Sequence, residues 1–354
     1  MKTNREDVRS LYRVVLGREP ESEAVIDTHL DTPSLEALIS IFVNSPENRL
    51  NNLALVARAA PAGKRFIPLD RAANSIEYLA SDEQLSQCLQ IVAQQWSALG
   101  EEKPHYSVLT DARFNPDELD KYEDDFWQSG NSEIDGVLRM LKRIGIVQTK
   151  SLHALELGCG VGRVTYALAP HFASVAAYDI SAPHLKIANK RAQKISAKNI
   201  AFHHVQPDTF LKTLGNQLAP SFWSTITKLQ NSVEAQPLQY CDFIYSRIVL
   251  QHNPPPVMHH IIQALLACLR PNGIAILQLP TYRLGYAYAI NTWLRHHTKS
   301  DMEMHCLPQQ AVSQLAAQAN CEILEVSEDA STGSDRYISN TFAIQKKVTP
   351  HELF

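Results

Sequence analysis

The chain has 354 residues, of which 45% are hydrophobic and 20% charged, and its formal net charge is −4. This composition is typical of a globular protein and excludes a disordered chain, and the length predicts two domains, or one large domain with an extension. The slight acidic excess disfavours a protein whose main task is to bind the backbone of a nucleic acid.

The chain is expected to lie in the cytoplasm. No apolar run approaches the roughly 20 residues that a bilayer span needs. The charged N-terminus lacks the apolar core of a secretory signal. None of the six cysteines belongs to a C-x-x-C pair, so we expect reduced thiols that pack as small apolar side chains.

Residues 1–55 are predicted to form a small helical domain, because apolar side chains recur at helical spacing over 8–16 and over 35–42. The motif Tyr12-x-x-x-Leu16-Gly17-Arg18-x-Pro20 resembles a short bacterial domain that is often attached to enzymes of cell-surface glycan assembly. That resemblance implies a role beside a glycan enzyme or in recruiting a protein partner. A helical extension that packs on the main domain is the alternative.

Residues 56–81 are expected to be a linker, because Ala59-Ala60-Pro61-Ala62-Gly63 is small and flexible in composition. The main domain is expected over 82–354. It begins with a predicted helix over 82–99, which Gly100 would end.

From residue 150 onward, short apolar runs alternate with helical patterns, which predicts an α/β fold with a doubly wound, mostly parallel sheet. The expected strands are 153–157, 174–178, 200–205, a fourth within 243–250, and 273–279. The chain ends with a predicted helix over 309–317 and two strands over 322–326 and 337–344, which would pair antiparallel because no crossover helix separates them.

The most informative segment is Leu155-Glu156-Leu157-Gly158-Cys159-Gly160-Val161-Gly162-Arg163, between a predicted strand and a predicted helix. Glycines there let the backbone approach a ligand closely. The spacing is not that of a dinucleotide loop, because Arg163 stands where the third glycine belongs. Glu156 suits a positively charged ligand, and Asp179, 19 residues past Gly160, could accept the hydroxyls of a ribose.

Together, this loop and Tyr178-Asp179-Ile180-Ser181 resemble the class I S-adenosylmethionine-dependent methyltransferases. The resemblance covers roughly residues 82–346. It implies a seven-stranded methyltransferase sheet, S-adenosyl-L-methionine as cofactor, and a cofactor site on the loop and on the ends of the second and fourth strands. The residues so implied are Glu156, Gly158, Cys159, Gly160, Gly162, Asp179, Ile180, Ser246 and Arg247.

Two further segments are assigned to the cofactor by the same resemblance. Phe126-Trp127-x-Ser129-Gly130 resembles an N-terminal lid, so Trp127 and Gly130 would cover the methionine part; a core anchor is the alternative for Trp127. Gln206 follows the third strand, where the family often has an acidic residue that faces the adenine.

His252, just after the fourth strand, is the candidate general base, because its ordinary pKa lies near neutral pH. A structural histidine is the alternative. The neighbouring Asn253-Pro254-Pro255 lacks the aromatic residue of the amino-directed DNA methyltransferases, so that function is rejected.

Polar and aromatic residues beyond the fifth strand could form an acceptor pocket, for which Tyr282, Tyr286 and His305 are the candidates; they could equally pack a helix. The histidine pairs lack metal-ligand spacing, so we expect no metal. The insert 215–239 could cap the site.

The sequence therefore predicts an enzyme that moves the methyl group of S-adenosylmethionine to an oxygen of a sugar, glycan or small hydroxylated molecule. A catalytically silent module that binds the nucleoside or recruits a partner is the alternative. A nucleic-acid partner is disfavoured and no membrane span is expected.

Overall fold

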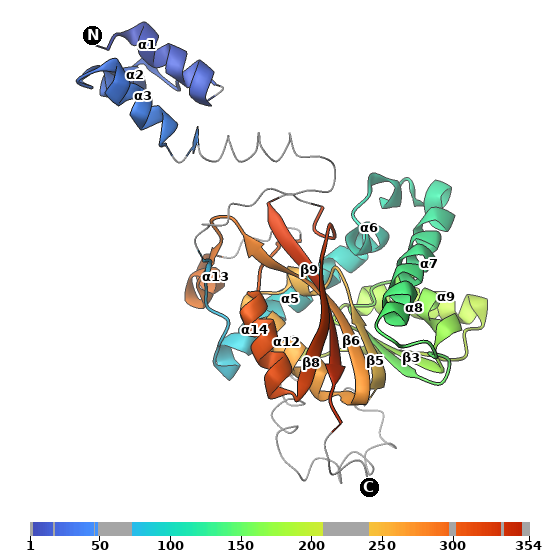
Figure 1. The fold of residues 1–354 in the computed structure, drawn as a ribbon. Helices are drawn as coiled ribbons and strands as arrows, with labels where there is room; N and C mark the ends of the chain where they lie inside the picture. Colours follow the sequence, from blue (N-terminus) through green and yellow to red (C-terminus); the bar gives the residue numbers. More distant parts are fainter. Residues whose placement is uncertain are drawn as a thin grey trace. The chain divides into compact units, whose positions relative to one another are not determined.

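The computed structural model describes residues 3–16, 18–45, 47–48, 73–207, 241–296, 302–333 and 336–348. The chain forms two compact units, Met1–Ala72 and Ala73–Phe354 (Figure 1). The end of the predicted linker belongs to the second unit, because β1 (Ser75–Ile76) pairs in parallel with β7 (Ala287–Tyr288). The predicted capping insert, 215–239, lies outside the described residues.

Short helices pack around one small core in the first unit. They are α1 (Arg5–Leu11), which continues as the π-helical turn η1 (Tyr12–Leu16), α2 (Glu23–Leu30) and α3 (Leu35–Val43). The side chains of Asn4, Ser22 and Ser34 accept hydrogen bonds from backbone N–H groups at the starts of α1, α2 and α3. Helix α2 was not predicted from the sequence, since its only buried residue is Ile26.

The second unit is built on a seven-stranded sheet in the order β4-β3-β2-β5-β6-β9-β8. Its strands are β2 (His153–Leu157), β3 (Ser174–Asp179), β4 (Ile200–His204), β5 (Cys241–Ser246), β6 (Leu269–Arg283), β8 (Cys321–Asp329) and β9 (Tyr337–Lys346). The first five of these are parallel, and β9 is antiparallel to both β6 and β8. The predicted doubly wound, mostly parallel sheet is confirmed.

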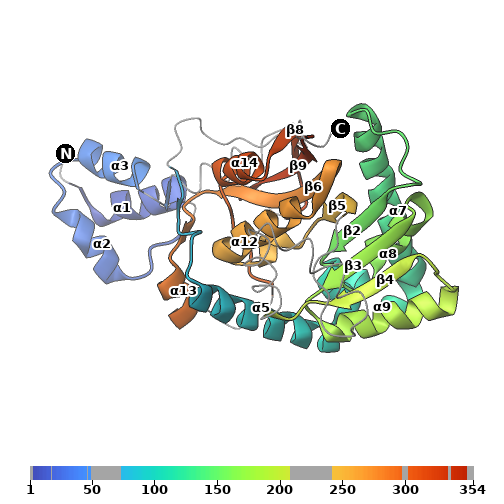
Figure 2. The same cartoon turned by 90° about the horizontal axis from the view of Figure 1, so that it is seen from below.

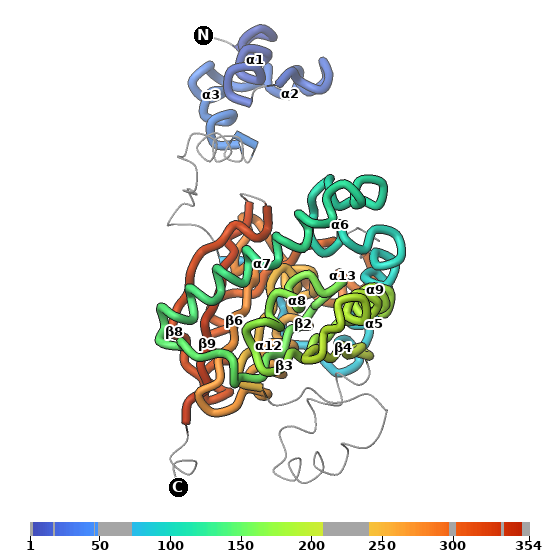
Figure 3. Tube along the Cα trace, turned by 90° about the vertical axis from the view of Figure 1, so that its right-hand side faces the viewer, coloured from blue at the N-terminus to red at the C-terminus, as the bar shows by residue number. Residues whose placement is uncertain are grey.

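Both faces of this sheet are covered by helices, as strands that are apolar on both faces require. Along β6, Ile274 and Ile276 point to the face that holds α7, whereas Ala275 and Leu277 point to the face that holds α12 and α14. Figure 3 shows α7 crossing the first of these faces, where α8 also packs. The helices and turns of this unit, apart from the one treated next, are α6 (Pro104–Val108), η2 (Ala112–Phe114), α7 (Leu119–Arg143), α8 (Arg163–Leu168), η3 (Ala169–His171), α9 (Ala182–Ile195), η4 (Leu250–His252), α12 (Pro255–Ala267), α13 (Ile290–His296) and α14 (Gln309–Gln318).

Helix α5 (Asp82–Glu102) extends three residues beyond its predicted end, so the expectation that Gly100 stops it was wrong. Gly100 lies inside the helix, and its missing side chain makes room for α9: a Cβ there would lie 2.6 Å from His184 Nδ1 and 2.6 Å from Ser181 Oγ. Figure 2 shows α5 lying lengthwise beneath the sheet, from α13 toward α9. This path brings α5 against the edge where the parallel strands end.

Candidate active site

The loop between β2 and α8 adopts a conformation that needs its glycines. Gly158, Gly160 and Gly162 all have positive φ angles, of 78°, 53° and 89°. A Cβ at Gly158 would lie 2.2 Å from Val249 Cγ2, and one at Gly160 would lie 2.4 Å from Val108 Cγ2. The glycines therefore satisfy the backbone geometry and also let neighbouring segments close over the loop.

Asp179, at the end of β3, ties this loop to the neighbouring strand. One carboxylate oxygen accepts the N–H of Gly160 at 2.7 Å and the other accepts the N–H of Ser181 at 2.8 Å. The side chain is buried. Asp179 thus holds the glycine loop in place and also presents a carboxylate where the two strands end.

A pocket lies over the loop and Asp179, in the crevice where open α/β sheets bind their ligands. Its wall combines the loop, the ends of β3 and β5, and one side of α5 and α6. Seven residues implied by the family resemblance line it, namely Glu156, Gly158, Cys159, Gly160, Asp179, Ile180 and Arg247. An apolar part of the wall is formed by Leu89, Val92, Val205, Val249 and Ile261.

Glu156 is buried at the base of this pocket and accepts a hydrogen bond of 2.6 Å from Thr165 Oγ1. Burial raises the pKa of its carboxyl to about 8, against the opposing effect of the Thr165 hydroxyl. The group is therefore protonated at neutral pH. A positive charge arriving beside it would favour the ionised form.

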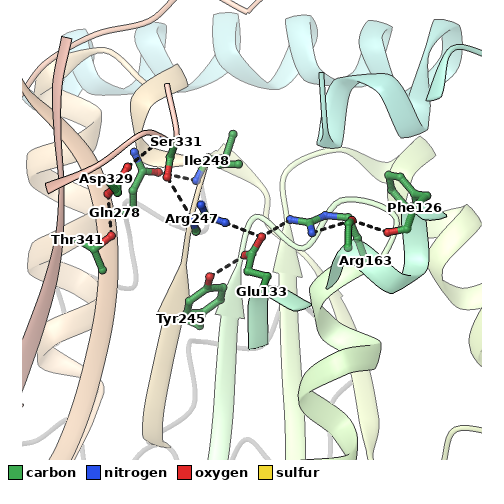
Figure 4. A network of polar contacts seen from close by, with 11 residues as sticks. Phe126, Glu133, Arg163, Tyr245, Arg247, Ile248, Gln278, Asp329, Ser331 and Thr341 are labelled. Carbon is green, nitrogen blue, oxygen red and sulfur yellow. Dashed lines mark hydrogen bonds and ion pairs between the residues drawn. The ribbon is translucent and has the colours of Figure 1, made fainter. Parts of the chain in front are cut away.

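A second acidic side chain, Glu133 on α7, joins three elements at one end of the pocket (Figure 4). Its Oε2 accepts Arg163 Nη2 and Arg247 Nη1, each at 2.7 Å, and its Oε1 accepts Tyr245 OH at 2.7 Å. Burial alone would raise the pKa of Glu133, but the two guanidinium groups hold it below its usual value. Glu133 was not predicted from the sequence, because nothing local marks a residue in the middle of a long amphipathic helix.

Five of the residues predicted to bind the cofactor are not among the described residues that line the pocket. Gly162 closes the turn into α8, and Gly130 lets α7 approach α8, since a Cβ there would lie 2.3 Å from Arg163 O. Ser246 donates to Leu157 O at 3.1 Å and so joins β5 to β2. Gly162, Gly130 and Ser246 therefore shape the backbone around the pocket.

The other two are Trp127, which is half-buried and packs on a small apolar cluster, and Gln206, which is exposed. Trp127 packs edge-on against Phe126, stacks under the guanidinium of Arg191 and donates from Nε1 to Glu123 at 3.0 Å. These contacts favour the core-anchor alternative, and the role of Trp127 as a lid residue stays a prediction. Gln206 is paired with His204 at 2.9 Å.

His252 packs edge-on against Trp96, and both of its ring nitrogens have partners. Nδ1 donates to Glu303 O at 3.1 Å, which leaves Nε2 to accept from the side-chain amide of Gln251 at 3.2 Å. Burial lowers the pKa of His252 to about 4. Its role as general base stays a prediction, and its contacts favour the structural alternative.

None of the three predicted acceptor residues is among the described residues that line that pocket, and two of them contact each other. Tyr286 OH lies 2.8 Å from His305 Nδ1, and Trp293 and Tyr288 pack edge-on against the same imidazole. Tyr282 and His305 are buried. Their role in binding an acceptor stays a prediction.

Helix α6 was not assigned to the site from the sequence, yet it forms part of the pocket wall. Ser107 Oγ lies 2.8 Å from His184 Nε2, and Ser181 Oγ lies 2.7 Å from His184 Nδ1. Burial lowers the pKa of His184, so the ring is neutral and bridges the two hydroxyls. On α5, the helical spacing of Leu89, Val92 and Trp96 could be recognised from the sequence. The sequence did not show which edge of the sheet these three residues would cover.

This donor set fits S-adenosylmethionine. The positive φ angles of the glycines give the loop a backbone shape that can lie along a ligand, Asp179 offers a carboxylate to a ribose, and the apolar wall suits a nucleobase. Within the described ranges, no group of three or more His, Cys, Asp or Glu side chains is placed to hold a metal ion. None of the helices described is long and apolar enough to cross a membrane.

Comparison with known proteins agrees with this geometry. Residues 127–326, more than half of the chain, match the family model described as methyltransferase domain. None of the curated proteins matches the chain. Solved structures similar to it include magnesium protoporphyrin IX methyltransferase from Synechocystis PCC 6803 with bound SAH, with 16% identity, 73% of this chain and 99% of that chain covered, and a TM-score of 0.48.

Another similar structure is 1,6-didemethyltoxoflavin-N1-methyltransferase from Burkholderia thailandensis, with 14% identity, coverage of 80% of this chain and 99% of that chain, and a TM-score of 0.45. The family assignment itself rests on the matching model and on the loop and strand ends described above. The chain therefore belongs to the methyltransferase domain family.

Proposed function

We propose that this protein transfers the methyl group of S-adenosylmethionine to an oxygen of a small hydroxylated molecule, with a sugar or glycan as the acceptor class. The observation that carries the methyl-transfer part is the glycine loop fastened to Asp179 beneath a pocket. Support for the acceptor class comes from the resemblance of residues 7–50 to a domain attached to glycan enzymes.

The residues of the pocket have distinct tasks in this proposal. Asp179 would accept the ribose hydroxyls while its hydrogen bond to Gly160 keeps the loop in register. Glu156 would face the positively charged part of the ligand. The apolar residues on α5 would exclude water from the adenine base of the cofactor. When bound, S-adenosylmethionine supplies a methyl group on a positively charged sulfur that is already activated for displacement.

A hydroxyl acceptor also has to lose its proton. His252 remains the candidate from the sequence, and it is uncharged at neutral pH because burial lowers its pKa to about 4. The chain's main contribution is then to align the acceptor oxygen and to exclude water, which can account for a large part of the rate of such a transfer.

The proposal is tested by incubating the protein with S-adenosylmethionine and a panel of sugars, glycans and small hydroxylated molecules. Release of S-adenosylhomocysteine that requires one acceptor, with the methyl group located on an oxygen by mass spectrometry and NMR, is the expected result. Asp179→Ala serves as the matched control for background turnover. A methyl group found on nitrogen or carbon would overturn the acceptor proposal, and tight cofactor binding without any turnover would favour the silent binding module.

A further inference from the structure

The chain leaves β5 through a strained residue. Ile248 lies two positions past the end of β5, lines the pocket, and has a φ angle of 60°. This left-handed conformation is costly for isoleucine, because its branched Cβ crowds the backbone, whereas glycine adopts it freely. Strain of this kind persists only where the surrounding structure holds it, and it gathers at functional sites.

One buried side chain holds the backbone of Ile248 in this conformation. Gln278 on β6 is 1% exposed, and its Oε1 accepts the N–H of Ile248 at 2.7 Å (Figure 4). Its Nε2 donates to Ser339 Oγ at 2.7 Å and to Gln251 Oε1 at 3.1 Å. Both donors of the amide are therefore used, and its oxygen is the atom that faces Ile248.

The direction of these hydrogen bonds is fixed by a backbone carbonyl. Because Glu303 O can only accept, His252 Nδ1 donates to it, and His252 Nε2 accepts from the amide nitrogen of Gln251. The oxygen of Gln251 then accepts from Gln278, whose own oxygen accepts from Ile248. Turning either amide over would place two donors together and two acceptors together. The network therefore presents an acceptor to the Ile248 N–H in one orientation only.

The conformation of Ile248 sets the course of the segment that covers the glycine loop. The next residue, Val249, lines the pocket and packs on the loop, since a Cβ at Gly158 would lie 2.2 Å from Val249 Cγ2. The carbonyl of Val249 accepts Asn253 Nδ2 at 2.8 Å, which closes the following turn. If Ile248 relaxed to a negative φ, the chain would leave β5 in another direction and Val249 would move from the loop.

We propose that Gln278 is a positioning residue of the site: it holds Ile248 in the left-handed conformation that seats Val249 on the glycine loop. Gln278 is not among the described residues that line the pocket, so its effect on a ligand passes through Ile248. The inference rests on the proposed function, because it assumes that the pocket takes S-adenosylmethionine.

The test is a double-mutant cycle of Gln278→Leu and Ile248→Gly in the full chain. Isothermal titration with S-adenosylhomocysteine measures binding, and urea unfolding measures stability. We expect Gln278→Leu alone to weaken binding at least tenfold, about 1.4 kcal/mol, because Ile248 then relaxes. In the Ile248→Gly background the same substitution should weaken binding less than twofold, because glycine adopts the left-handed conformation without being held.

Two variants serve as matched controls. Asn340 on β9 is another buried amide, which accepts Thr281 Oγ1 and Gln309 Nε2 but does not line the pocket. Asn340→Leu should lower the urea midpoint and leave the affinity for S-adenosylhomocysteine unchanged. Asn272 is another left-handed residue, with a φ angle of 63°, outside the pocket lining. Asn272→Gly should leave binding unchanged.

The outcomes separate positioning from a purely structural role. Equal losses of binding in the two backgrounds, or no loss in either, overturn the positioning role. A Gln278→Leu protein that unfolds more easily but binds normally overturns it as well. Should Gln278→Leu fail to fold, Gln278→Met, which better preserves the volume and also lacks the amide oxygen, replaces it in the cycle with the same expectations. A wild-type protein that fails to bind S-adenosylhomocysteine contradicts the proposed function, and the positioning role falls with it.

Discussion

At the scale of single residues, Asp179 combines two tasks, because it fixes Gly160 and Ser181 by their backbone N–H groups and also lines the pocket. Asp179→Ala removes both acceptors. We expect S-adenosylhomocysteine to bind more than tenfold more weakly, a loss of about 1.4 kcal/mol or more, measured by isothermal titration. Asp242→Ala is the matched control, since Asp242 likewise accepts a backbone N–H, from His153, but does not line the pocket. Unchanged affinity in Asp179→Ala would contradict its role.

Glu156 allows a second prediction at this scale. Its pKa of about 8 means that the carboxyl is protonated at pH 7, and an ammonium group bound nearby would lower that pKa. We therefore expect S-adenosylhomocysteine binding at pH 7 to release protons. Titrations in two buffers with different ionisation enthalpies measure this release, which Glu156→Gln should abolish. Proton uptake, or release that persists in the variant, would count against this account of Glu156.

At the scale of elements, the contact of α7 with α8 depends on Gly130. A Cβ there would lie 2.3 Å from Arg163 O, whereas a Cβ at Gly136, on the same helix, would only meet Arg139 Nη2 at 3.8 Å. Gly130→Ala should lower the free energy of unfolding by about 1–3 kcal/mol, through overpacking that also pushes Glu133 from Arg163. Gly136→Ala should raise it by up to about 1 kcal/mol, through helix propensity. Urea unfolding measures both, and equal effects would show that the helix contact is not tight.

At the scale of elements, the helices and strands that were predicted correctly are those whose pattern lies within their own stretch of sequence. The strands β2, β3 and β9 and the helix α14 lie within one or two residues of their predicted bounds, because each is bounded by its own apolar pattern. Helix α5 continues past Gly100, where its end was predicted. The close approach of His184 from α9 requires a glycine at this position, so the glycine does not mark a helix end. A contact of that kind leaves no mark in the neighbouring sequence.

At the scale of the whole molecule, stability should depend on pH through half-buried histidines. Burial lowers the pKa of His105, His252 and His260 to about 4, whereas the unfolded value is about 6.5. Between these values the unfolded chain binds more protons, so stability falls as the pH falls. Glu156 acts in the opposite sense, since its raised pKa costs stability as the pH rises toward 8.

Because the effect of the three histidines outweighs that of Glu156, we expect a lower free energy of unfolding at pH 5 than at pH 7. Urea titration at the two pH values measures it. Replacing His252 by Gln should reduce the difference between the two pH values. A stability that is equal at both pH values, or higher at pH 5, would refute the assignment of these half-buried histidines as neutral.

The division into two units gives a prediction about binding. The described residues that line the pocket all lie between 89 and 261, within the second unit. A chain restricted to residues 73–354 should therefore bind S-adenosylhomocysteine with the affinity of the full chain, within about twofold, as calorimetry would show. A large loss of affinity, with the truncated chain shown to be folded, would mean that the first unit contributes to the site.

The sequence by itself determined the alternation of strands and helices, the glycine loop, and Asp179 at the end of β3. These follow from short-range rules: apolar periodicity makes the elements, and glycines permit the positive φ angles of the loop. Only the tertiary structure decided that Glu133 joins Arg163 to Arg247, and that His184 joins α6 to α9. Residues so far apart in the chain meet because helices pack on a common sheet, and the distances between their side chains are set by that packing alone.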